Sequence, residues 1–463
     1  MKKSLIIFCV VLVLSLALIV SAFAVVSPKA DDVTFTETTV FGDINKAEDI
    51  SVDVHANLDY RLHWDITHSL SGKTETDFHF TQASEYPEHE YTYNGLLPNL
   101  DYNYHRSGSS LLLDDDDYGV SGYIEMVKDV MARATPNEDY TEKLYLRDYM
   151  EYLPVRADYD YEHVFVEYEK ENELAELFAD YFKIPVKDYT AEISVYVDSD
   201  GNLMSYGVYS PDIYGSYSSV LVGDKTYFTL GWRENNAMGE TMDYSHVPGG
   251  YGIYCADVRF TQLENSTYRE IDAKNSKLST VYPLEDNQEV VTLTRSYDGE
   301  NLLMFTYEEG ESYMTVISLN TFETLQRIRL FDSFKDDEYQ PAVNFARVLE
   351  KGIAVFSGYE KFDILEYTDE GYKYDFSGDL TRAWEQFEEG YIYGEQVMDY
   401  DGERFACAIN LGAMRSCDFA LALFDAEGMQ YVGRFDCSLG IPGESNYGRY
   451  ARLDDSKALE IHL

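Results

Sequence analysis

The sequence predicts a mainly β protein built from repeated four-stranded units, and three observations lead to this prediction. After Pro185, short apolar runs alternate with turns rich in Gly, Asp and Asn. The segment 271–284 is echoed by the segment 317–330, at an offset of 46 residues. Candidate turn residues recur at intervals of 49 to 53 residues, at Gly201, Gly250, Gly299, Gly352, Gly402 and Asp455. A period near 50 with four strands per period indicates one structural unit used repeatedly.

Four strands can be assigned to each of two well-defined units. Around Gly299 they are expected at 290–293, 302–307, 313–319 and 325–330. Around Gly402 they are expected at 395–400, 404–409, 419–424 and 430–435. Three of the turns carry Asp-Gly, at 200–201, 298–299 and 401–402, a dipeptide that tolerates the positive φ angles of tight hairpins. We interpret 271–284 as a strand, a turn and a second strand, which would form the outer half of one unit.

The N-terminal residues 31–95 are predicted to be β strands, because apolar and polar residues alternate at 33–36, 50–54 and 60–64. The last repeat retains only 450–453 and 458–463, so it lacks two strands. We expect 33–40 and 50–54 to supply the missing pair, since an incomplete array would leave strand edges exposed. In the alternative, the N-terminal strands form a unit of their own.

Residues 96–185 are predicted to be a partly helical insertion ahead of the repeats at 186–463. Apolar residues recur at three and four positions between Ile124 and Ala134, and Thr135-Pro136 ends that pattern. A second helix is expected at about 169–182, with Leu174 and Phe178 on its apolar face.

The repeat resembles the β-propeller families at superfamily level, over residues 186–463. The resemblance implies about six four-stranded blades, or seven if the N-terminal strands form a separate blade. The sharper family signatures are missing: there is no Gly-His with Trp-Asp pair, the segment 296–299 lacks the spacer of the sialidase Asp-box, and no repeat has the Trp docking motif of quinoprotein propellers. The resemblance therefore implies an architecture and no particular activity.

The N-terminus carries an export signal within residues 1–30. Lys2 and Lys3 precede a run of 23 uncharged residues from Ser4 to Val26. Its length suffices for a bilayer-spanning helix, and the lysine pair would keep its start in the cytoplasm, so we expect a retained membrane anchor. The segment Ala22-Phe23-Ala24 offers a cleavage site, so a removed signal peptide is the alternative. In both cases the rest of the chain is expected outside the cytoplasm, on the cell membrane or secreted.

The charge of the chain disfavours polyanionic partners. The 463 residues include 36 Lys and Arg against 84 Asp and Glu, for a formal net charge of −48. Such a surface repels phosphate backbones, so nucleic acid and anionic membrane surfaces are poor partners. Cationic ligands, divalent metals and an extracellular ligand or cell-envelope protein remain as partners. In the alternative, the acidic residues only solvate the surface.

Four cysteines follow the export signal, and an exported compartment permits disulfides. Cys407 and Cys417 flank a turn-like segment, so they are expected to face each other if that turn closes a hairpin. The other interpretation is that Cys255, Cys407, Cys417 and Cys437 are all buried free thiols.

The acidic segment 114–125 matches a twelve-residue calcium loop at several positions. Asp114, Asp116 and Glu125 occupy positions 1, 3 and 12, which predicts them as calcium ligands and makes calcium the one cofactor that the sequence suggests. Tyr118 at position 5 departs from the pattern, and no helix precedes the loop. The alternative is a solvated acidic loop at a helix start. Residues 198–202 also have calcium-like spacing, but a hairpin turn explains them fully.

Histidines are concentrated near the N-terminus, with six of nine before residue 106. The tripeptide His63-Trp64-Asp65 places His63 and Asp65 on the same side of a strand, which suggests a zinc site or an acid–base pair. Chance clustering on wet strands is the alternative, because no H-E-x-x-H or cysteine-pair spacing supports a metal site.

The motif search favours a non-catalytic role. The chain has no G-x-S-x-G nucleophile elbow, no P-loop and no dinucleotide glycine fingerprint. We therefore predict an extracytoplasmic, membrane-tethered module that binds a ligand or protein. The alternative is a glycan-active hydrolase or lyase that uses acidic residues at the propeller mouth, with tyrosines as stacking platforms. A third interpretation is a calcium-stabilised structural module.

Overall fold

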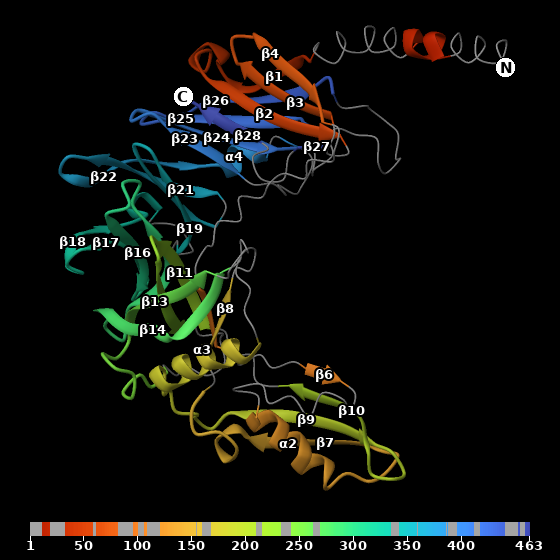
Figure 1. The fold of residues 1–463 in the computed structure, drawn as a ribbon. Coiled ribbons are helices and arrows are strands. Elements are labelled where there is room, and N and C mark those ends of the chain that lie inside the picture. The colour runs from red at the N-terminus through yellow and green to blue at the C-terminus, as the bar shows by residue number, and fades with distance from the viewer. Residues whose placement is uncertain are drawn as a thin grey trace, which may run out of the picture. The chain divides into compact units, whose positions relative to one another are not determined.

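The computed structural model is mainly β and divides into two compact units (Figure 1). Unit 1 comprises Met1–Glu90 and Arg347–Leu463, and unit 2 comprises Tyr91–Ala346. The structure describes residues 12–18, 33–58, 62–81, 96–100, 106–108, 121–153, 155–159, 168–209, 215–232, 242–262, 269–334, 342–358, 360–385, 387, 396–411, 417–439, 452–453 and 459–463.

Two sheets of unit 2 are each formed by four consecutive antiparallel strands. The first has the order β11 (Gly215–Val222), β12 (Lys225–Trp232), β13 (Gly252–Gln262) and β14 (Arg269–Pro283). The second has the order β15 (Glu289–Arg295), β16 (Asn301–Glu308), β17 (Glu311–Ser318) and β18 (Thr324–Arg329). The second sheet confirms the four strands predicted around Gly299.

The same meander recurs twice toward the C-terminus. One sheet has the order β19 (Val343–Leu349), β20 (Gly352–Ser357), β21 (Lys361–Thr368) and β22 (Gly371–Asp379), and its first strand spans the division between the units. The next has the order β23 (Val397–Tyr400), β24 (Arg404–Asn410), β25 (Phe419–Asp425) and β26 (Gly428–Cys437), as predicted around Gly402. In this succession of four-stranded antiparallel sheets the chain resembles β-propeller repeat proteins.

Burial along the strands explains why the repeat is visible in the sequence. The central strand β25 is buried on both faces from Phe419 to Phe424, so it is a continuous apolar run. The last strand of the Gly299 sheet, β18, alternates between exposed and half-buried residues. A strand at the middle of a packed sheet loses both faces to the core, whereas an outer strand keeps one face in water. Each period therefore contains apolar middle strands and a more polar outer strand.

The Asp-Gly turns adopt the predicted backbone conformation. Gly201, Gly299 and Gly402 have φ angles of +83°, +72° and +99°. In the 198–202 turn the Asp198 carboxylate accepts hydrogen bonds from the backbone N–H groups of Asp200 (2.9 Å) and Asn202 (2.8 Å). The hairpin interpretation of 198–202 is thus confirmed. Gly352, in contrast, begins strand β20 and is not a turn residue, and Asp455 lies outside the described residues.

The interpretation of 271–284 as two strands joined by a turn is wrong. The structure has a single strand, β14, which contains a large bulge. Asp257 of β13 pairs with Lys277, and Arg259, two residues later, pairs with Asp272, so β14 has three extra residues at this point. Local hydrogen bonds absorb the extra residues, because the Ser276 hydroxyl donates to the carbonyl of Asp272 at 2.8 Å. The echo at 317–330 does contain the predicted turn, between β17 and β18.

Both ends of the chain contribute to one sheet of unit 1, where red-orange and blue strands lie side by side in Figure 1. It contains β2 (Ser51–Leu58), β3 (Leu62–Ser69) and β4 (Thr74–Phe80), with β27 (Arg452–Leu453) and β28 (Leu459–His462) paired along the free edge of β2. The strand predicted at 50–54 therefore completes the last repeat.

The expectation that the strand at 33–40 also completes the last repeat is wrong. β1 (Phe35–Gly42) pairs with β26 and becomes the fifth strand of the β23–β26 sheet. Phe35 contacts the ring of Phe419, with centroids 5.5 Å apart, and the ring of His68, with centroids 4.7 Å apart. Aromatic packing near the core thus accompanies the attachment of β1 to the neighbouring sheet.

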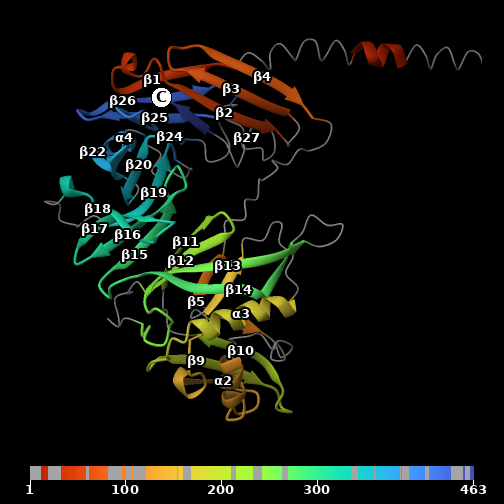
Figure 2. The same ribbon diagram turned by 60° about the vertical axis from the view of Figure 1, so that its left-hand side comes forward.

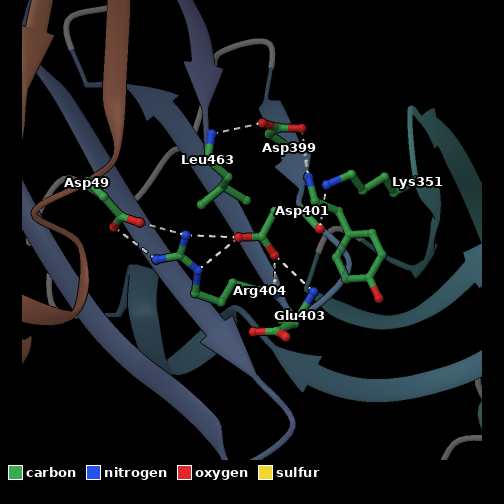
Figure 3. A network of polar contacts seen from close by, with 8 residues as sticks. Asp49, Lys351, Asp399, Asp401, Glu403, Arg404 and Leu463 are labelled. Atoms are coloured by element: carbon green, nitrogen blue, oxygen red, sulfur yellow. Dashed lines mark hydrogen bonds and ion pairs between the residues drawn. The ribbon is translucent and has the colours of Figure 1, made fainter.

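Polar contacts from Arg404 and Asp399 anchor the segments beside β2 and β28 (Figure 3). Arg404 donates one hydrogen bond to each carboxylate oxygen of Asp49, both at 2.9 Å, and a third to Asp401 at 2.9 Å. The pKa of Asp49 is lowered, chiefly by the hydrogen bond from Arg404. The backbone N–H of Leu463 donates to Asp399 at 3.0 Å. Asp49 precedes β2 and Leu463 follows β28, so the network holds both strands of the junction.

Helices occur mainly in unit 2, as Figure 2 shows. The sheet β6 (Arg106–Gly108), β10 (Leu203–Tyr209), β9 (Thr190–Val197) and β7 (Asp139–Tyr145) is covered by α2 (Ser121–Met131). α3 (Tyr168–Tyr181) contacts β14 and β8 (Val155–Tyr159), which pairs with β5 (Leu96–Leu100). Both predicted helices are confirmed. The Gly201 hairpin shares its sheet with β6 and β7, so these two strands of 96–185 belong to the sheet of the first repeat.

Short helical turns complete the structure, at η1 (Ile44–Lys46), η3 (Leu146–Asp148), η4 (Asp332–Phe334) and α4 (Thr381–Trp384). Of the N-terminal apolar run, residues 12–18 are described and are helical. Across the part of the chain that the structure describes, no helix has both the length and the apolar character needed to cross a membrane.

The four described cysteines are buried free thiols. Cys407 pairs with Ala422, so the expectation that it faces Cys417 is wrong. The register that pairs Phe419 with Phe435 brings Cys417 opposite Cys437 in the core. In the hairpin of β24 and β25, the residue opposite Cys407 is thus five positions beyond Cys417.

We expect the protein to lose stability in acid because one of its histidines is buried in the neutral form. Burial lowers the pKa of His68 to about 4, and its ring Nδ1 lies 2.9 Å from the Thr74 hydroxyl. The unfolded chain takes up a proton at this residue near its ordinary pKa of about 6.5, so stability falls as the pH drops from about 6.5 to 4. Between pH 7 and 4 we expect the protein to lose about 2 kcal/mol more unfolding free energy than a His68→Gln variant. Urea denaturation at each pH measures this, and parallel pH profiles would contradict it.

Candidate metal-binding face

The sheet formed by both chain ends has one buried and one solvent-facing side. Val52, Val54, Trp64 and Ile66 point into the core of unit 1. Because successive side chains of a strand point to opposite faces, the residues between them point outward. We call this side the outer face, and its acidic and histidine residues are Asp53, His55, His63, Asp65, Glu75, Asp77, His79, Glu460 and His462.

The strand register aligns the outward residues in rows. In one row His55 of β2, Asp65 of β3 and Asp77 of β4 are direct cross-strand neighbours. In the next row His63 is opposite His79. Directly opposed residues have Cβ atoms about 4.5–5.5 Å apart, so each of these side chains is within reach of the one directly opposite it.

The Asp65 carboxylate lies at the centre of this group. Its Oδ1 is 2.7 Å from His55 Nδ1, and its Oδ2 is 3.6 Å from His79 Nδ1. The rings of His63 and His79 stack with centroids 4.9 Å apart and an interplanar angle of 10°. Imidazoles of β2 and β4 therefore flank one carboxylate, and the His63 ring stacks on the imidazole from β4.

Asp65, Asp77 and His79 form a ligand set of the kind that holds a divalent cation. Each offers one ligand atom, and these atoms lie within 4.8 Å of one another. The side chains of Asp65 and His79 are 45% and 46% exposed, so an ion from solution can reach them. Carboxylate oxygen and imidazole nitrogen together suit zinc and neighbouring transition metals. Two like charges directly opposed across a sheet repel, and a bound cation would relieve that repulsion.

The structure describes some of the site residues predicted from the sequence and not others. Asp114 and Asp116 lie outside the described residues, and Glu125 is exposed on α2. The calcium loop thus stays a prediction. The placement of His63 and Asp65 on one side of a strand is confirmed. The partners His55, Asp77 and His79 were missed, although their alternation with neighbouring inward-facing residues in β2 and β4 was the available signal.

A separate groove in unit 1 has a volume of about 630 Å³. Its lining includes three carboxylates and one guanidinium, from Asp379, Glu385, Glu427 and Arg382. The aromatic residues among its described lining are Phe41 and Phe424, and tyrosine is not among them. No tyrosine platform of the kind that the glycan-enzyme interpretation expects is found among the described residues of this groove.

Comparisons with known proteins give structural neighbours only. No family model matches the chain, and no curated protein matches it. The β-propeller domain of Myceliophteria thermophila Cps50 (Swd1) is 11% identical, with 53% of this chain and 82% of that chain covered and a TM-score of 0.24. The Pseudomonas aeruginosa periplasmic gluconolactonase is 12% identical, with 58% and 72% covered and a TM-score of 0.26.

A putative 6-phosphogluconolactonase from Bacteroides uniformis is 10% identical, with 87% of this chain and 88% of that chain covered and a TM-score of 0.25. The chain spans 46% and 64% of the length of two other matched structures, a chain of the mitotic checkpoint complex and a protein from Lactobacillus plantarum. The resemblance to propeller proteins thus depends on the strand order described above.

The opposed carboxylates predict an effect on stability without metal. In EDTA, Asp77→Asn should raise the free energy of unfolding by about 0.2–1 kcal/mol, because it removes the repulsion with Asp65. Glu75→Gln on the same strand and face is the matched control. Because Glu75 forms an ion pair with Lys73, this variant should be less stable than the parent protein or equally stable. Urea denaturation measures both variants, and an Asp77→Asn variant less stable than the parent would contradict the repulsion.

Proposed function

We propose that the protein is a non-catalytic binding module outside the cytoplasm, and that its ligand is a divalent transition-metal ion held on the outer face. The observation that carries the proposal is the convergence of Asp65, Asp77 and His79 within 4.8 Å of one another. The three residues come from neighbouring strands over a packed core, which supports their positions without a ligand. His55 orients the Asp65 carboxylate, as an outer partner of a metal ligand does.

The proposed architecture is a propeller of six blades. Five sheets follow the repeat between β6 and β26, and the N-terminal strands β2 to β4 share the sixth with β27 and β28. This sharing supports six blades over seven, because the N-terminal strands do not form a sheet of their own. The N-terminal run of 23 uncharged residues supports export and a membrane tether.

The proposed site predicts zinc binding that depends on named side chains. Calorimetric titration of the full-length protein with Zn²⁺ measures this affinity. The Asp77→Asn and His79→Ala variants should bind zinc at least about tenfold more weakly than the parent protein, because loss of even an outer partner of a metal ligand weakens binding by that much. The matched control is Glu75→Gln, which removes an acid from the same strand and face and should leave this affinity unchanged. Equal zinc affinity in the parent and in the Asp77→Asn and His79→Ala variants would overturn the proposed site.

The proposed location predicts where the protein is found in the producing cell. The full chain should sediment with membranes after lysis and be digested when protease is added to cells with a permeable outer envelope, because the export signal places the repeats outside the cytoplasm. Recovery in the soluble extracytoplasmic fraction would instead indicate a cleaved signal. Recovery in the cytoplasm, protected from protease, would contradict the export.

A further inference from the structure

A second group of metal-ligating side chains lies where the two ends of the chain meet. Asp53 of β2 is directly opposite Glu460 of β28, and His462 follows two residues later on the same side of β28. The His462 Nε2 is 2.9 Å from Asp53 Oδ2. The ligand atoms of Asp53, Glu460 and His462 lie within 4.8 Å of one another. This group shares no residue with Asp65, Asp77 and His79.

We infer that Asp53, Glu460 and His462 form a divalent-metal site that fastens the C-terminal strand to the N-terminal strand. Two carboxylates and one imidazole form a set that favours zinc, cobalt, nickel or manganese over calcium, which prefers a larger number of oxygen ligands. The Thr67 hydroxyl donates to Asp53 Oδ1 at 2.6 Å, so one oxygen is held by the protein and the other faces His462.

The charges at the junction support a cation at this place. Asp53 and Glu460 are like charges in direct cross-strand register, an arrangement that disfavours pairing of β2 with β28. The His462 and Asp53 side chains are 51% and 28% exposed, which leaves the group open to ions from solution. A bound cation would replace the repulsion between the two strands with an attraction from both to one ion.

The position of the site gives metal binding a structural consequence. Asp53 and His462 are 409 residues apart in sequence, and β28 is only four residues long. A metal that binds the paired strands and not the separated ones must stabilise their pairing. Metal should therefore slow the opening of β28 in particular.

Hydrogen exchange of the full-length protein, followed by mass spectrometry with and without ZnCl₂, tests this site. Zinc should slow exchange in the peptide that contains 459–463 by roughly tenfold or more at zinc well above its dissociation constant, because exchange by strand opening then requires metal release. Magnesium chloride at the same concentration is the cation control and should give little protection.

Three variants separate this site from the first one. Glu460→Gln keeps the Asp53–His462 hydrogen bond, so the strand pairing is retained, and it should remove most of the zinc protection at 459–463. His462→Ala should remove it as well. Asp77→Asn should leave this protection intact, although it weakens the other proposed site. Zinc protection at 459–463 that persists in Glu460→Gln and His462→Ala, or that is absent in the parent protein, would overturn the inference without deciding the Asp65–Asp77–His79 site.

Discussion

The pairing of β28 with β2 is the constraint on which unit 1 depends. Residues from the two ends of the chain form one sheet there, so its core of Val52, Val54, Leu459 and Ile461 exists only when the ends have met. The Arg404 guanidinium holds Asp49 just before β2, and Asp399 holds the last residue, Leu463. A bidentate arginine–carboxylate pair fixes geometry as well as contributing energy. The closure also brings Glu460 and His462 of β28 beside Asp53 of β2 on the outer face.

The periodicity of the sequence predicted the strands of the Gly299 and Gly402 sheets closely, because a central strand buried on both faces must be an apolar run and each tight turn needs a residue that tolerates positive φ. Sequence patterns mispredict the chain where local hydrogen bonds substitute for a turn. The polar residues near Asp272 look like a turn in sequence, yet Ser276 and Asn275 bond back to Asp272 and leave the strand continuous. The place of β1 was not predictable either, since neighbouring sheets both offer an edge to an amphipathic strand, and tertiary packing decides between them.

The candidate site was predictable only in part for a related reason. Alternation alone places His63 and Asp65 on one side of β3. Which residues stand beside them depends on the register of β2 and β4, and a shift by one residue would turn every partner to the other face. The register that brings His55, Asp77 and His79 to Asp65 is fixed by the buried side, where Trp64 packs on Phe78 with ring centroids 5.1 Å apart. Core packing on one face thus determines the metal-ligating pattern on the other.

The proposed function requires that the sheet closed by both chain ends presents a divalent-metal site formed by Asp65, Asp77 and His79. Anomalous X-ray diffraction at the zinc absorption edge, from crystals grown with ZnCl₂, locates bound zinc directly. We expect an anomalous peak about 2.0–2.2 Å from oxygen atoms of Asp65 and Asp77 and from a ring nitrogen of His79. Zinc peaks elsewhere on the protein, with none beside these three side chains while their surface is free of lattice contacts, would contradict it.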